Sequence, residues 1–210
     1  MSKLNIIYKK EFDIQRVINT IKKIDWYVEN KINYKTFSFP QKIDKEKLKG
    51  YSEEEITNIV ITEYSDVLYK ENEKFLVENW NKVSKEIESA FSKSSLLCQE
   101  EYRIFLTKYG TAGSYDLPNT IIINISKVFG IGMLKTIIHE ITHLAIEENI
   151  TKYKIGQAQK ERIVDLFFVK NFPKRAILQN IYMSMNTDKI DQTFDDNFPN
   201  MENVIKKLSE

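Results

Sequence analysis

Both histidines of this chain lie in one short segment, Lys135–Ala145, which reads KTIIHEITHLA. The spacing of its apolar residues predicts a helix, and a helix places His139 and His143 one turn apart on one face, with Glu140 beside them. Isoleucine and leucine occupy most neighbouring positions, so this helix must be largely buried. A buried helix that directs two imidazoles and a carboxylate into one cavity needs a partner that satisfies them.

Zinc is the partner that such a segment predicts, because catalytic zinc sites take three protein ligands and keep a fourth position for water. With no third histidine, the remaining ligand has to be a carboxylate or Cys98, the single cysteine. The segment QKERIVDLFF carries Glu161 and Asp165 four residues apart, on one face of a second expected helix. If the two helices pack side by side, Glu161 reaches the metal and Asp165 accepts the second ring N–H of one histidine. The plainer alternative is two core histidines hydrogen-bonded to nearby carboxylates.

The pattern His139-Glu140-x-x-His143, followed by Glu161-x-x-x-Asp165, resembles the active site of the gluzincin clan of zinc metallopeptidases, which includes the thermolysin-like enzymes. The resemblance implies a Zn²⁺ cofactor held by the two histidines and Glu161, with Glu140 as general base and Asp165 orienting a ligand histidine. The implied activity is hydrolysis of a peptide bond by a metal-bound water. The implied partner is a peptide or protein substrate.

Family members also carry a strand ahead of the active-site helix that binds extended substrate as an added strand. Asn119–Asn124 (NTIIIN) is similar in place and character, within a resemblance that covers roughly residues 100–175. Thermolysin-like enzymes use a downstream histidine to stabilise the oxyanion, and this chain has none. Tyr153 is the residue expected to replace it, with Tyr182 and Arg162 as further candidates.

The Gly-x-Met-Glu-Asn element of the aminopeptidase branch has no counterpart here. The segment Gly130–Lys135 (GIGMLK) directly abuts the expected helix and lacks the acidic and amide positions. An endopeptidase is therefore favoured. Two other functions stay open: a non-catalytic or latent binding or scaffold protein on a zincin fold that retains its zinc, and hydrolysis of a non-peptide substrate at the same metal.

The order of expected elements predicts an α+β fold, with a zincin-like catalytic domain built from a small mixed sheet, an active-site helix and a glutamate helix. Residues 1–97 are expected to form a mostly helical N-terminal part, and residues 98–210 the metallopeptidase domain with a C-terminal helical tail. Trp26–Pro40 is expected as strand and loop, and Thr111–Asn119 as a loop rich in turn formers. That loop either walls the substrate cleft, with Tyr115 at its rim, or is a simple hairpin connection.

Composition argues against other classes of partner. The formal net charge is +1 with only four arginines, so no basic field for nucleic acid is expected. No uninterrupted apolar stretch is long enough to span a bilayer, and the N-terminus does not resemble a signal peptide. The lone Cys98 cannot form an internal disulfide, which fits a cytoplasmic location. The sequence indicates no oligomeric state.

Overall fold

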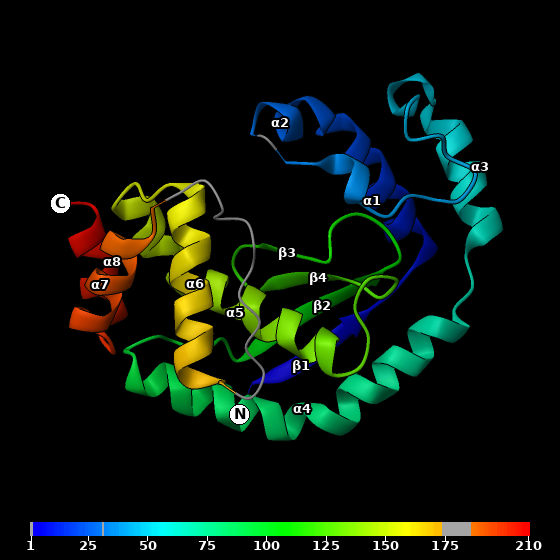
Figure 1. Ribbon diagram of the computed structural model, residues 1–210. Coiled ribbons are helices and arrows are strands. Elements are labelled where there is room, and N and C mark those ends of the chain that lie inside the picture. Colours follow the sequence, from blue (N-terminus) through cyan, green and yellow to red (C-terminus); the bar gives the residue numbers. More distant parts are fainter. Residues whose placement is uncertain (1, 31, 174–185) are drawn as a thin grey trace.

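The computed structural model describes residues 2–30, 32–173 and 186–210 and shows a mixed α+β protein (Figure 1). Its sheet has four strands in the order β1-β2-β4-β3. The strands are β1 (Lys3–Ile7), β2 (Glu101–Thr107), β3 (Gly113–Asp116) and β4 (Thr120–Asn124). Strands β1, β2 and β4 run parallel, and β3 runs antiparallel beside β4. The predicted α+β class with a small mixed sheet is confirmed.

Eight α-helices and two short 3₁₀ helices lie within the described ranges. They are α1 (Lys10–Lys22), α2 (Ile24–Glu29), η1 (Tyr34–Thr36), η2 (Leu48–Gly50), α3 (Glu53–Glu63), α4 (Val67–Lys93), α5 (Ile131–Lys152), α6 (Gln157–Asn171), α7 (Asp188–Asn197) and α8 (Met201–Leu208). In Figure 1 the long helix α4 runs along the lower side of the view, with α1–α3 at the upper right and α6–α8 at the left. Local signals set several ends: Ser52 and Glu55 form a capping box at α3, and α5 begins after Gly130, whose φ of 54° favours glycine.

The two faces of the sheet are covered by different helices. Side chains of β2 and β4 that are at most 1% exposed join residues of α4 to α8 in the larger hydrophobic core. They are Tyr102, Ile104, Leu106, Ile121 and Ile123. On the opposite face Phe12 of α1 stacks on Phe105 at 4.6 Å between ring centroids, and Thr107 donates a hydrogen bond of 2.6 Å to Asp13. Helix α5 therefore lies on one face of the sheet and α1 on the other.

Both hydrophobic cores draw on residues from either side of position 97. Strand β1 pairs with β2 in the register Lys3↔Glu101, and α4 lies in the same core as α5. A smaller core joins α1, α3 and the intervening segment with Tyr109. The division into 1–97 and 98–210 stays a prediction about domain organisation, while the sheet itself is shared between the two parts.

Two stretches differ from the expected elements. Trp26 to Glu29 continue helix α2, where strand and loop were expected, because Ile24 at the start of that helix is buried in the smaller core. Within Thr111–Asn119, residues 113–116 form strand β3 in place of a loop. They pair with β4 across a short connection, so backbone pairing outweighs the turn-forming composition.

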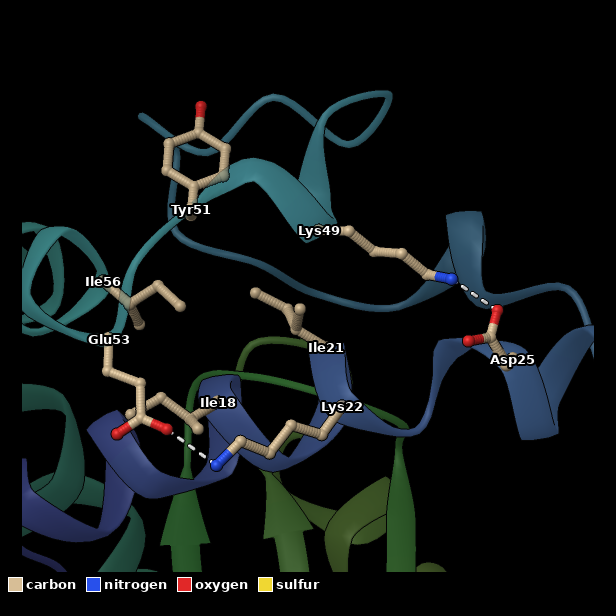
Figure 2. A pocket seen from close by; sticks show the side chains of 8 residues that line it. All are labelled: Ile18, Ile21, Lys22, Asp25, Lys49, Tyr51, Glu53 and Ile56. Carbon is tan, nitrogen blue, oxygen red and sulfur yellow. Dashed lines mark hydrogen bonds and ion pairs between the residues drawn. The ribbon is translucent and has the colours of Figure 1, made fainter.

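None of the described helices combines the length and the apolar composition that crossing a bilayer requires. Two cavities at the surface lie in the N-terminal part. One, of about 300 Å³, is lined by Ile18 and Ile56 among others, with the ion pairs Lys22–Glu53 (2.6 Å) and Lys49–Asp25 (2.5 Å) at its rim (Figure 2). A second lies beside it around Leu48. Neither is lined by a residue of the HExxH segment.

Candidate metal centre

Helix α5 carries the predicted histidines and is buried along most of its length. Ile137, Ile138 and Ile141 are fully buried in the larger core, as the sequence predicted. His143 is 2% exposed and Glu140 is 7% exposed, so two titratable side chains lie inside a predominantly apolar environment. The helix starts after a glycine and ends in a turn at Tyr153.

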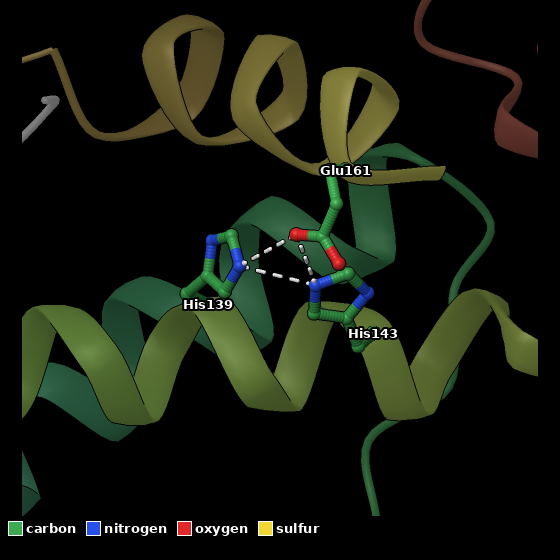
Figure 3. A group of neighbouring side chains, drawn as sticks. All are labelled: His139, His143 and Glu161. Carbon is green, nitrogen blue, oxygen red and sulfur yellow. Dashed lines mark hydrogen bonds and ion pairs between the residues drawn. The ribbon is translucent and has the colours of Figure 1, made fainter. Parts of the chain in front are cut away.

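Three candidate ligand atoms converge between α5 and α6 (Figure 3). The Nε2 atoms of His139 and His143 are 3.0 Å apart. Oε2 of Glu161 lies 3.2 Å from Nε2 of His143 and 3.4 Å from Nε2 of His139. The structure thus brings together the three residues that the sequence predicted as metal ligands, from two helices joined by a short loop.

The spacing of these atoms and their chemistry fit a divalent metal. Four ligands at about 2.0–2.2 Å in a tetrahedron lie about 3.3 Å from one another, which matches the three measured separations. Two imidazole nitrogens and a carboxylate oxygen present lone pairs to a common point, which is unfavourable without a cation or a proton between them. The two-nitrogen, one-oxygen set is one that zinc accepts. Nδ1 of His143 is buried and has no hydrogen-bond partner among the described residues, which leaves Nε2 as the nitrogen directed at the metal position.

Asp165 lies behind His139, as predicted for a residue that orients a ligand. Its side chain is 3% exposed, and Oδ1 is 3.9 Å from Nδ1 of His139. This distance is within ion-pair range, so the carboxylate faces the outer nitrogen of the ring. Cys98, the other ligand type left open by the sequence, lies outside this group. Burial raises the pKa of the Cys98 thiol to about 11, which keeps it protonated.

The metal-free centre is strongly coupled electrostatically. Burial alone would raise the pKa of Glu161, but hydrogen bonds with His139 and His143 outweigh it and lower that pKa below its usual range. Burial alone would lower the pKa of His139, but Glu161, Glu140 and Asp165 together raise it. In the absence of a metal, these contacts therefore favour a protonated His139 beside an ionised Glu161.

Glu140 differs from the other acidic residues of the centre because it has no hydrogen-bond partner within the described ranges. The residue is 7% exposed, its carboxylate oxygens are not sealed from solvent, and burial raises its pKa despite the neighbouring histidines. Gly113 of β3 lies directly against it: a Cβ there would sit 2.4 Å from Oε1 of Glu140 and 2.5 Å from Cγ2 of Thr136. Sequence reasoning missed Gly113, although a glycine inside a strand is a known sign of close backbone approach.

A second group lies beside His143, and of its members the sequence singled out only Tyr115, as a candidate for the rim of a substrate cleft. The Tyr115 ring stacks on the His143 ring with 5.1 Å between centroids and 11° between planes. The Tyr115 hydroxyl donates to Glu147 at 2.6 Å and accepts from Nζ of Lys160 at 2.8 Å. These contacts join β3, α5 and α6 beside two of the ligands. Burial and Glu147 raise the pKa of Tyr115, so its hydroxyl stays protonated.

The structure does not bring the expected oxyanion donors to the triad. Tyr153 lies at the end of α5, about 15 Å along the helix axis from His143, and its hydroxyl donates to Glu202 at 3.2 Å. The guanidinium of Arg162 binds Asp191 of α7 through two hydrogen bonds of 2.7 and 2.6 Å. The third candidate, Tyr182, is outside the described residues.

The expectation that Asn119–Asn124 binds substrate as an edge strand is wrong. This segment forms β4, which is paired on one side with β2 and on the other with β3. Its hydrogen-bonding groups are therefore already taken by the sheet. The strand at the edge nearest α5 is β3, which lies in the segment that the sequence suggested as a cleft wall.

Comparisons with known protein families, with curated proteins and with solved structures found no match to this chain. The fold and the site together define a mixed α+β protein in which two histidines and one glutamate are arranged to hold a metal ion.

Proposed function

We propose that this chain is a zinc-dependent peptidase of the gluzincin type, with a zincin-like fold, that cleaves within peptide chains. The observation that carries the proposal is Glu140, a buried carboxylate beside two metal-ligand candidates that makes no hydrogen bond to the described residues. A purely structural metal site has no need of such a group, whose burial without a partner costs free energy.

The proposed chemistry assigns each residue one task. Bound zinc would polarise the scissile carbonyl and make a water molecule more acidic. His139, His143 and Glu161 would hold the metal, and Asp165 would orient His139. Glu140 would accept the proton of the attacking water and then deliver it to the leaving amine, which its unoccupied carboxylate oxygens allow.

The edge of β3 supports an extended peptide as substrate. The backbone N–H of Asn124 donates to the carbonyl of Ala112, so in the antiparallel ladder Ser114 and Asp116 also bond toward β4. The backbone groups of Gly113 and Tyr115 consequently face the free edge. These two residues contact Glu140 and His143, so a strand added to β3 would run past the metal centre.

A cleavage experiment tests the proposal. The zinc-loaded protein is incubated with a diverse peptide library, with and without chelator, and the products are identified by mass spectrometry. We expect internal cleavage that the chelator abolishes and that Glu140→Gln abolishes without loss of zinc. Glu148→Gln, an exposed position on the same helix, is the matched control and should cleave normally. Absence of chelator-sensitive cleavage would refute the proposal.

One observation favours a second function, a non-catalytic zinc-binding scaffold on the same fold. Tyr153 and Arg162 are engaged with Glu202 and Asp191, so neither is at hand to stabilise an oxyanion. A scaffold would bind zinc stoichiometrically, cleave nothing, and bind its partner equally well with Glu140→Gln.

A further inference from the structure

The guanidinium of Arg16 lies on the face of the sheet opposite the metal centre, over the start of β3. Its Nη2 donates to Oγ1 of Thr111 at 3.2 Å and to Oγ of Ser114 at 3.1 Å. The backbone of Gly110 lies directly against the guanidinium, since a Cβ on Gly110 would lie 2.7 Å from Nε of Arg16. Helix α1 thus supplies a cation to the strand whose other face contacts Glu140.

This cation has no carboxylate within ion-pair distance among residues 2–30, 32–173 and 186–210. Its Nε is buried and has no hydrogen-bond partner in the part of the chain that the structure describes. Nη1 makes no hydrogen bond to the described residues either, and unlike Nε it is not sealed from solvent. By contrast, Arg162 is paired with Asp191. A guanidinium fork matches a carboxylate, and a half-buried one left without an anion is poised to bind one.

The alternation of β3 relates Arg16 to a peptide at the free edge. The Cα of Gly113 and the side chain of Tyr115 lie on the face of β3 that contacts α5. The hydroxyl of Ser114 lies on the opposite face and points to Arg16 of α1. Residues directly opposite each other in neighbouring strands share a face. A peptide residue opposite Ser114 would therefore point to Arg16, and its two neighbours would point toward the metal.

The open part of this edge is limited on one side. Ser38 pairs with Gly110 through hydrogen bonds of 3.0 and 2.8 Å, so the backbone there is already occupied. The stretch that remains begins beyond this bridge and contains Ser114. Within it the Gly113 carbonyl already accepts a hydrogen bond of 2.7 Å from Oγ1 of Thr111, which leaves its second lone pair for a peptide N–H. A peptide on it lies next to Arg16, with Asp116, two residues along the same face, as the nearest acidic side chain of β3.

We propose that Arg16 is a specificity-determining residue that binds the side-chain carboxylate of a substrate Asp or Glu opposite Ser114. The inference rests on the proposed function, because it takes β3 as the strand beside which the substrate lies. The inferred substrates are extended peptides that carry an acidic residue opposite Ser114. The two peptide residues that flank this acidic residue face Glu140 and His143.

The test separates binding from cleavage. Fluorescently labelled peptides that differ only by Glu or Gln at each position in turn are titrated into zinc-loaded Glu140→Gln protein, and affinity is measured by anisotropy. We expect one position at which Glu binds about tenfold more tightly than Gln, as for one charged hydrogen-bonded pair. Arg16→Gln should abolish that difference, and Arg16→Lys should retain part of it. Arg103→Gln, on the same face of the sheet over Phe105, is the control and should change nothing.

Each outcome bears on a different claim. Equal binding of Glu and Gln peptides at every position, with chelator-sensitive cleavage intact, would overturn the Arg16 inference and leave the proposed function standing. A Glu preference that Arg16→Gln removes, without any cleavage by the wild-type protein, would support the subsite and refute the peptidase. No peptide binding at all would overturn the inference. If Arg16→Gln does not fold, the comparison of Glu and Gln peptides on protein that retains Arg16 still tests the inference.

Discussion

Gly113 lies against the carboxylate of Glu140 so closely that no larger residue fits, since a Cβ would be 2.4 Å from Oε1. The edge strand and the proposed general base are therefore in direct contact. The Glu140 carboxylate can keep its position relative to the metal ligands only because residue 113 has no side chain.

Gly113→Ala is expected to displace Glu140 and Thr136 and to destabilise the fold by about 1–3 kcal/mol, as overpacking usually does. Peptide cleavage should fall more than zinc affinity, because the displaced group is not a ligand. Chemical denaturation, zinc titration and cleavage rates check this. Gly132→Ala is the control: nothing lies within 4 Å of its added methyl, and alanine in a helix should stabilise by about 0.5–1 kcal/mol. Equal stability and equal cleavage rates of Gly113→Ala and Gly132→Ala would contradict the close contact between Gly113 and Glu140.

Tyr115→Phe keeps the ring on His143 and removes the hydroxyl that joins Glu147 to Lys160. We expect a loss of about 1–2 kcal/mol in stability, because the buried Lys160 and the half-buried Glu147 each lose a partner and keep only their direct ion pair of 3.4 Å. Zinc affinity should change little, because the retained ring keeps its contact with His143 and the lost hydroxyl bonds to none of the three ligands. Competition with a chromophoric chelator measures that affinity. Tyr153→Phe is the matched control at the far end of α5 and should leave zinc affinity unchanged.

Glu140→Gln should raise stability in the metal-free protein, with a gain that grows with pH. The folded-state pKa of Glu140 is raised above the unfolded value, so ionisation at higher pH destabilises the native state. Below the unfolded pKa both states are protonated and the variant gains nothing by this route. Unfolding curves in chelator across the acidic and neutral range measure the difference. A gain that is constant with pH would contradict a raised pKa.

Zinc should stabilise the wild-type chain by about 2.7 kcal/mol when present at a hundred times its dissociation constant. Glu161→Gln should abolish most of this stabilisation, because it removes one of the three ligands. The Glu161 pKa is lowered in the folded state, so in chelator the wild-type protein also loses stability as pH falls below the unfolded value. Thermal unfolding with and without zinc checks both. Retention of the full zinc effect in Glu161→Gln would mean that the metal binds elsewhere.

The local part of the site was predictable from the sequence, and the part that depends on tertiary packing was not. His139 and His143 share a face by helical periodicity alone, and Glu161 follows on the next helix. Tyr115 and Gly113 were not predicted as contacts, because turn-forming neighbours hid strand β3. Tyr153 was expected near the metal from its sequence distance, whereas its position is set by the direction of α5 and by Glu202 of α8.

The sheet and the metal centre also differ in the sequence separation of the residues that they bring into contact. His143 and Glu161 are only eighteen residues apart, whereas β1 pairs Lys3 with Glu101. Contacts between close neighbours in sequence form quickly, and distant strand pairing is slow because long loops must close first. The α5–α6 hairpin should therefore bring its ligands together early in folding, and the sheet should complete later. Metal capture would then precede the pairing of β1 that completes the sheet beside the centre.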